Sequence, residues 1–210
     1  MFLVGLTGGI ASGKSTVSAM LEKKGACIID ADRIGHEVIK KGREGYRELV
    51  REFGEGIVGS DGEIERPRLA ATVFGDPEKV SRLNAITHPL ITCEIISRIE
   101  QCRNEKGEGG IAVLDAALLL EAGGRGLVDM LVVVAAPVAL QVDRLRKDRG
   151  MAEEEASARI SAQSSLEEKK KQADWVVENS GSIEDLEAGV EELWREILRR
   201  SASSDRGQPQ

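Results

Sequence analysis

Short apolar segments alternate along this chain with longer segments whose apolar residues recur at helical spacing. The apolar segments, which suit strands covered on both faces, occur at 2–6, 26–29, 111–114, 130–134 and 175–177. Helical patterns follow the first of these at 14–24 and the last at 183–198. This alternation predicts an α/β fold of three layers around a parallel central sheet.

The pattern changes between about 42 and 107. Helical stretches there are interrupted by a glycine-broken segment at 54–62, and Pro67, Pro77 and Pro89 stand where a proline suits the first turn of a helix. We therefore predict an inserted helical lobe in this stretch.

A second insertion, at about 144–171, is highly charged, helical in composition and poor in anchoring residues, which predicts a mobile lid. The tail at 201–210 is polar and without periodicity, and we expect it to be disordered. The remaining core of a single domain would be formed by about 1–41, 108–143 and 172–200.

Composition narrows the class of protein. The chain has 210 residues, 41% of them hydrophobic and 31% charged, which is typical of one ordinary globular domain. Its net charge of -7 would repel a polyanion, so nucleic acid is not expected as a partner. No apolar run has membrane-spanning length and the start lacks a secretory signal, so we expect a cytosolic protein. We further expect a monomer or a weak homo-oligomer.

Cysteines and charge clusters add two expectations. Cys27, Cys93 and Cys102 form no CxxC pair, and their odd number at wide spacing predicts reduced, partly buried thiols. Basic residues cluster at 144–149 and at 169–171. We interpret the three lysines of the second cluster as a solvated helix face, whereas the arginines of the first would suit a phosphorylated ligand.

The strongest motif runs from Gly8 to Ser15 and matches G-x-x-x-x-G-K-[ST] between a predicted strand and a predicted helix. Backbone N–H groups of such a loop converge on phosphate oxygens at the positive end of the helix dipole. Lys14 would reach the β and γ phosphates of ATP, and the Ser15 hydroxyl would bind Mg²⁺. The predicted nucleotide-binding residues are Gly9, Ile10, Ala11, Ser12, Gly13, Lys14, Ser15 and Thr16.

Acidic residues follow two of the predicted strands. Asp30 and Asp32 would lie at the carboxyl edge of the sheet, on one face if the strand persists. Asp32 is our candidate for the base that orients an attacking hydroxyl and for a magnesium ligand; alternatively, one of the two caps the next helix. Asp115 ends another apolar strand, which is a weak signal for metal binding when taken alone. No Asn-Lys-x-Asp segment occurs, which disfavours a Ras-type GTPase.

Three segments together closely resemble the dephospho-coenzyme A kinase family: 7–16, Asp30-Ala31-Asp32, and Leu83-Asn84-Ala85-Ile86-Thr87-His88-Pro89. Further matches are Ala117 to Glu121, Arg159 with Gln163, and Asn179-Ser180-Gly181. The resemblance extends to about Arg199.

This resemblance implies transfer of the γ-phosphoryl group of ATP to the ribose 3′-hydroxyl of dephospho-coenzyme A, with Mg²⁺. It implies Asp32 as base, Arg159 and Asn179 at the nucleotide, and His88, Leu118 and Glu121 at the acceptor. For His88 a purely structural role at a helix start is equally consistent with the residues.

The chain departs from the family pattern in two places. Ala117 and Leu120 replace the usual proline and phenylalanine, and both keep the segment apolar. In the lid, Asp148 stands where the family pattern has arginine, and Arg149 follows it. A shift by one residue rotates a helical side chain by about 100°. Our hypothesis is that Arg144 and Arg149 together clamp the transferring phosphoryl group.

Two rival functions stay open on the sequence alone. The shared fold and phosphate loop also suit another nucleoside or nucleotide kinase. A chain whose shifted lid arginine abolishes catalysis would instead be an ATP-binding regulatory module.

Overall fold

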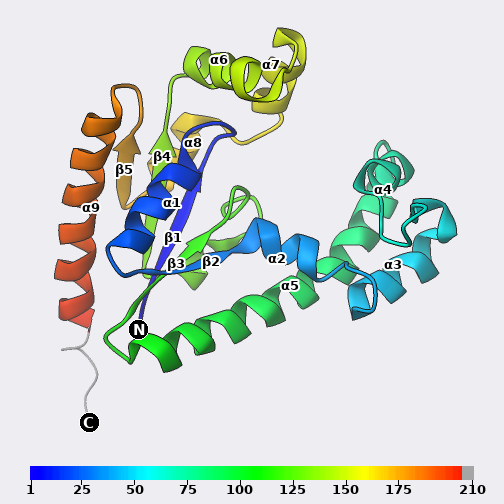
Figure 1. Ribbon diagram of the computed structural model, residues 1–210, viewed down its shortest axis with the longest axis horizontal. Coiled ribbons are helices and arrows are strands. Elements are labelled where there is room, and N and C mark those ends of the chain that lie inside the picture. The colour runs from blue at the N-terminus through cyan, green and yellow to red at the C-terminus, as the bar shows by residue number, and fades with distance from the viewer. Residues whose placement is uncertain (205–210) are drawn as a thin grey trace. The chain divides into compact units, whose positions relative to one another are not determined.

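The computed structural model describes residues 1–204, and this chain folds as two compact units (Figure 1). Of the described residues, the first unit holds 1–29 and 102–204, and the second holds 30–101. The second unit overlaps the stretch for which the sequence predicts an inserted helical lobe.

A five-stranded parallel sheet forms the centre of the first unit, in the order β2-β3-β1-β4-β5. In register, Val4 of the central strand lies opposite Val113 on one side and Met130 on the other. All residues of β3 and β4 are buried, which is why both appear in the sequence as unbroken apolar runs. The predicted α/β fold is confirmed. The strands are β1 (Phe2–Gly8), β2 (Cys27–Asp30), β3 (Ile111–Asp115), β4 (Met130–Ala135) and β5 (Trp175–Glu178).

Two helices of the first unit cover one face of this sheet. Helix α9 lies beside β5, and α1 packs against both α9 and β1 (Figure 1). Their contact is apolar, with Val17 and Leu21 of α1 meeting Val190 and Leu193 of α9 in a fully buried cluster. The helices of this unit are α1 (Lys14–Lys23), α6 (Val138–Arg149), α7 (Glu153–Ser161), α8 (Leu166–Gln172) and α9 (Ile183–Ser204), with a short 3-10 turn, η2 (Gly124–Leu127).

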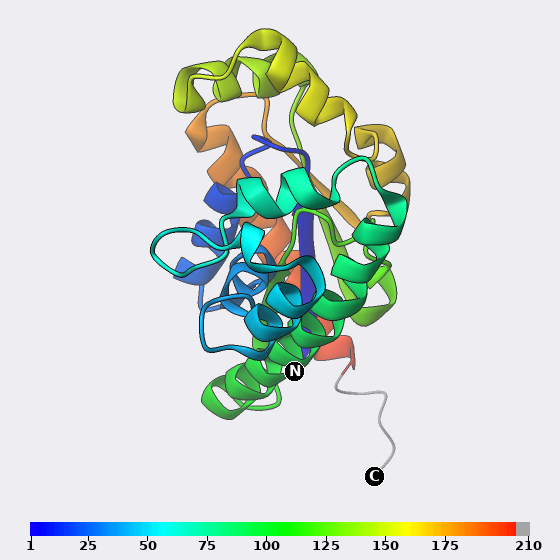
Figure 2. The ribbon, with the colours of Figure 1, turned by 90° about the vertical axis from the view of Figure 1, so that its right-hand side faces the viewer.

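The stretch with the predicted lid contains three of these helices. In Figure 2, α6 and α7 (yellow-green) lie side by side, and α8 (gold) follows them. α8 packs against β4. Two fully buried side chains, Ala156 of α7 and Lys169 of α8, anchor this stretch more firmly than its composition predicts.

Helix α9 is longer than its pattern predicts. It ends at Ser204, so the expectation of a disordered tail is wrong for residues 201–204. Residues 201–204 are polar and give no helical pattern of their own, but they continue the helix that the amphipathic segment before them begins. The rest of that expected tail lies outside the described residues.

The second unit is helical, with a core of its own. Leu49, Ile57, Ile64, Leu69 and Val73 are its buried centre, and a bridge between Val58 and Ile64 closes the glycine-broken segment. Its helices are α2 (Ala31–Glu37), α3 (Glu44–Phe53), η1 (Glu55–Ile57), α4 (Arg66–Val73) and α5 (Pro77–Lys106), of which the last five residues belong to the first unit.

One proline of this unit does not begin a helix. Pro67 and Pro77 lie at first-turn positions as predicted, but Pro89 lies inside α5. Proline cannot donate to the carbonyl four residues earlier, which is that of Ala85. Strong helical sequence on both sides of Pro89 outweighs the loss of this bond, so the prediction that a helix begins here is wrong.

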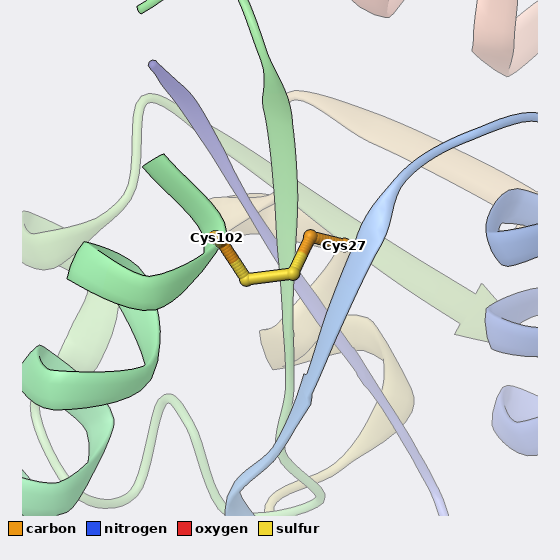
Figure 3. The surroundings of a disulfide bond; sticks show 2 residues. All are labelled: Cys27 and Cys102. Atoms are coloured by element: carbon orange, nitrogen blue, oxygen red, sulfur yellow. A yellow bond between two sulfur atoms is a disulfide. The ribbon is translucent and has the colours of Figure 1, made fainter. Parts of the chain in front are cut away.

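The prediction of reduced cysteines is wrong for one pair. A disulfide joins Cys27 of β2 to Cys102 of α5, with 5.9 Å between their Cα atoms (Figure 3). The two residues are 75 positions apart, and only the fold brings the start of β2 beside the end of α5. Cys93 is a free, exposed thiol.

Candidate active site

The glycine-rich motif forms the turn between β1 and α1, which confirms its predicted position between a strand and a helix. Ser12 N–H donates to the Gly9 carbonyl at 3.0 Å, and Ala11 takes a positive φ of 57°. Thr16 N–H donates to the Gly13 carbonyl at 3.0 Å, which begins α1. The turn therefore gathers backbone N–H groups at a helix N-terminus, where an anion is stabilised.

Glycines in this turn allow other protein atoms to approach the backbone more closely than a side chain would permit. Gly13 has a φ of 92°, and a β-carbon there would lie 2.0 Å from Nδ2 of Asn179. At Gly8 a β-carbon would lie 2.6 Å from Oγ of Ser12. That Ser12 hydroxyl is buried and has no hydrogen-bond partner within residues 1–204. A turn of glycine backbone beside a buried hydroxyl that lacks a partner is consistent with binding of phosphate oxygens.

Lys14 and Asp115 connect this turn to the next strand of the sheet. Lys14 is the first residue of α1, and its ammonium group forms an ion pair with Asp115, which is 5% exposed at the end of β3. The pair holds the cation at the carboxyl end of the sheet, where ligands bind in open α/β folds. A negatively charged phosphate can share Lys14 there.

Three side chains from the far end of the sequence contact the backbone of the turn. Arg144 of α6 donates to the Ala11 carbonyl at 3.1 Å and to Oδ1 of Asn179 at 3.3 Å. Asn179, which follows β5, donates to the Ser12 carbonyl at 2.7 Å. Arg144 and Asn179 therefore lie at the glycine-rich turn, and their roles toward a nucleotide stay predictions.

Gln163, between α7 and α8, is the third of these side chains. Its Oε1 accepts a hydrogen bond from the N–H of Ile10 at 2.8 Å. We did not predict a role for Gln163, although the family resemblance matched it together with Arg159. That match was the available signal.

Two predicted arginines lie elsewhere. Arg159 is exposed and pairs with Glu155, one turn earlier on α7, at 2.9 Å. Arg149 is exposed at the last position of α6, before Gly150. Neither has a recorded contact with the turn within the first unit as far as Ser204, so their roles at the nucleotide stay predictions.

The segment after β3 carries the predicted acceptor residues Leu118 and Glu121. Leu118 is 52% exposed. Oε1 of Glu121 pairs with Lys169 at 3.0 Å and accepts from the N–H of Ser164 at 3.3 Å. Burial raises the pKa of Glu121, but hydrogen bonds from its own backbone, from Lys169 and from Ser164 outweigh burial and lower that pKa overall.

The structure contradicts the expectation that Lys169 is solvated. The sequence predicts Lys169 to Lys171 as a solvated helix face, but the Lys169 side chain is only 1% exposed. Lys170 pairs with Glu178 and Lys171 is exposed. The charge run gave no signal of the inward orientation, because the partner Glu121 is distant in sequence.

In the second unit the two aspartates at the end of β2 have different local roles. The Asp30 side chain caps α2 by accepting from the N–H of Arg33 at 2.8 Å. The strand ends at Asp30, so the two side chains do not share a strand face. Asp32 is exposed in the first turn of α2.

His88 is an exposed residue within α5. Leu83 and Ile86, from the same family motif, pack against the core of the second unit. The motif therefore has an apolar side that holds α5 in place. The acceptor role of His88 stays a prediction.

The residues present fit a magnesium ion held mainly by phosphates and water. Ser15 is exposed in the first turn of α1, and the Asp115 carboxylate lies at the neighbouring strand end. No cluster of three or more acidic, histidine or cysteine side chains within residues 1–204 would form a metal cage. Mg²⁺ typically takes few protein ligands and keeps several waters.

Within residues 1–204, no helix is both long and apolar enough to cross a membrane.

Comparison with known proteins gives a consistent result. The family model for dephospho-CoA kinase matches residues 2–185. The dephospho-CoA kinase of Thermobifida fusca is 44% identical over 200 residues, covering 95% of this chain and 98% of its own. That of Symbiobacterium thermophilum is 46% identical over 195 residues, covering 93% of this chain and 81% of its own.

Solved structures agree with this result. The protein TT1252 from Thermus thermophilus has a TM-score of 0.81 at 36% identity, covering 93% of this chain and 97% of its own. Dephospho-CoA kinase from Campylobacter jejuni has a TM-score of 0.63 at 26% identity, covering 93% of this chain and 96% of its own. The shikimate kinase of Bacteroides thetaiotaomicron, at 15% identity and a TM-score of 0.51, shares the fold. With a glycine-rich turn between β1 and α1 and a family model that matches residues 2–185, this chain belongs to the dephospho-CoA kinase family.

Proposed function

We propose that this protein transfers the γ-phosphoryl group of ATP to the ribose 3′-hydroxyl of dephospho-coenzyme A, giving coenzyme A and ADP. The observation that carries the proposal is the family match over residues 2–185, which includes both the phosphate-binding turn and Asn179 that supports it. The relatives that share this match are named dephospho-CoA kinases.

In this proposal the turn from Gly9 to Thr16 binds the phosphates of ATP through its backbone N–H groups. Lys14 contacts the β and γ phosphates and neutralises charge as the bond to the leaving ADP breaks. Ser15 and Asp32 would hold Mg²⁺, which when bound would supply further positive charge at the phosphates.

Asp32 is the base in this proposal. It orients the ribose hydroxyl and accepts its proton as the oxygen attacks the phosphorus atom. Asp32 lies exposed in the first turn of α2. Arg144 and Arg149 clamp the transferring group, and closure of the lid excludes water, which would otherwise compete with the hydroxyl.

The test is ADP release with ATP, Mg²⁺ and dephospho-coenzyme A, run beside adenosine, AMP, cytidine and shikimate as acceptors. We expect turnover with dephospho-coenzyme A alone. Asp32→Asn should lower kcat by about 10²- to 10⁴-fold. Asp30→Asn is the matched control, because asparagine also caps helices and Asp30 is engaged in capping α2.

Turnover with a different acceptor would replace the proposed substrate. Nucleotide binding without turnover on any acceptor would instead support a regulatory module. Equal losses in the two aspartate variants would remove Asp32 from the role of base.

A further inference from the structure

Lys169 is a buried cation that the proposed reaction does not use. Its side chain is 1% exposed, whereas that of the next residue, Lys170, is 28% exposed. Lysine is seldom fully buried unless it is paired, because removing its charge from water is unfavourable. Its ammonium group pairs with Glu121 at 3.0 Å and donates to the Ala117 carbonyl at 3.4 Å.

Both partners of Lys169 belong to the loop that follows β3. The Ala117 carbonyl also accepts from the Thr7 hydroxyl at 3.2 Å, and Thr7 lies in β1 just before the phosphate-binding turn. Lys169 therefore contacts both ends of the segment 117–121. Between these ends Leu118 is 52% exposed, whereas Leu119 is buried at 4%, so the segment is held at both ends and presents one apolar side chain outward.

Residues 163 and 164, which lead into α8, contact both the glycine-rich turn and the segment 117–121. Gln163 accepts from Ile10 of the phosphate-binding turn, and Ser164 N–H donates to Glu121. Residues 163–169 thus touch the turn that would bind ATP and the loop at the carboxyl end of β3, where open α/β folds place ligands. The position suits control of the distance between two substrates.

Stability alone is a weak reason for such a pair. A buried ion pair contributes little net stability compared with apolar side chains of similar volume. A charge held by one carboxylate and one carbonyl does, however, define the position of both acceptors. That property matters where a loop must keep one shape.

We propose that Lys169 is a positioning residue which, through Glu121 and the Ala117 carbonyl, holds the loop 117–121 in the shape that receives the acceptor. The inference rests on the proposed function. It also changes the expected role of Glu121 from a direct substrate contact to a support of the loop.

The experiment compares Lys169→Met, Glu121→Gln and the double variant with wild type. Lys170→Met is the matched control, because it makes the same substitution at the next residue. For each protein, KM for dephospho-coenzyme A, KM for ATP and kcat are measured. Binding of dephospho-coenzyme A without ATP is followed by calorimetry, and Tm by thermal unfolding.

We expect Lys169→Met to raise KM and Kd for dephospho-coenzyme A about 10- to 100-fold, because a loop that is no longer held in shape must be ordered when the acceptor binds. KM for ATP should change less than about twofold, which identifies a loss of acceptor binding. Glu121→Gln should act in the same direction, and the double variant should be less impaired than the sum of the two because the residues are in contact. Lys170→Met should behave as wild type.

Unchanged acceptor binding in the variants would overturn the inference. A parallel change of KM for dephospho-coenzyme A and KM for ATP, together with a lower active fraction, would also overturn it. That result would indicate that the pair of Lys169 and Glu121 has only a structural role. If Lys169→Met does not fold, the Glu121→Gln variant tests the inference instead. Glutamine is similar in size to glutamate, and the side chain of residue 121 is partly exposed. A wild type that does not phosphorylate dephospho-coenzyme A would refute the proposed function itself, whereas an active wild type with unaffected variants refutes the inference alone.

Discussion

The side chain of Asn179 donates a hydrogen bond to the Ser12 carbonyl at 2.7 Å, across 167 positions of sequence. Asn179 also presents its Oδ1 to Arg144, whose guanidinium binds the Ala11 carbonyl. The shape of the glycine-rich turn is therefore fixed by Asn179, which follows β5, and by Arg144 of α6, in addition to its own glycines.

Asn179→Ala should weaken ATP binding and lower stability. It leaves the Ser12 carbonyl without this donor and Arg144 without one acceptor. We expect a loss of about 1–3 kcal/mol in the free energy of unfolding, as for a buried polar group left unsatisfied, and a higher KM for ATP. Urea unfolding and ATP titrations measure the two effects, with the exposed Asn104→Ala as control. Wild-type values for both quantities would show that the contact is dispensable.

The two-arginine clamp can be tested residue by residue. Arg144→Ala should lower kcat by about 10²- to 10³-fold, as the removal of a preorganised donor to the transition state does. Arg149→Ala should also lower kcat, because its guanidinium at the end of α6 would close on the same phosphoryl group. Single-turnover rates with saturating ATP are the measurement. If Arg149→Ala keeps full turnover while Arg144→Ala abolishes it, the clamp of two arginines is wrong.

The disulfide should contribute to stability under oxidising conditions. Closing a loop of this length, with 75 positions between Cys27 and Cys102, is expected to stabilise by about 4 kcal/mol. The double variant Cys27→Ser, Cys102→Ser should lose this contribution, and wild type treated with dithiothreitol should match it. Cys93→Ser, at the free thiol, is the control. Identical unfolding curves with and without reductant would contradict the bond.

The carboxylate of Glu121 should make the free energy of unfolding depend on pH. Its pKa is lowered in the folded protein, so its ionised form stabilises the fold above the ordinary value of 4.5, and this contribution is lost as pH falls through the lower folded pKa. Between about pH 5 and pH 3, wild type should lose more free energy of unfolding than Glu121→Gln does. Urea unfolding at each pH measures the difference. Glu187→Gln, at an exposed position of α9, should follow wild type, and equal slopes for all three proteins would disprove the effect.

Sequence pattern predicts the sheet and the phosphate-binding turn because both depend on local signals. A strand buried on both faces, such as β3, must be apolar throughout, and Gly13 must be glycine where φ is 92°. The motif and its flanks are therefore sufficient to predict that Lys14 and Ser15 lie at the start of α1, directly after this turn.

Long-range pairs escape this reasoning. Nothing near Cys27 indicates Cys102, and nothing near Lys169 indicates Glu121, since each pair is formed by chain segments that only the fold brings together. Pro89 is a different case. Its local signal was real, but the helical sequence on both sides of it determined the outcome.

The bond between Cys27 and Cys102 stands beside the two points at which the chain passes from one unit to the other, after Ile29 and before Cys102. Residues 27–102 therefore form a covalently closed loop that contains the whole second unit. A protease that cuts this loop once leaves two fragments that remain a single molecule, and they part only when the sulfurs are reduced.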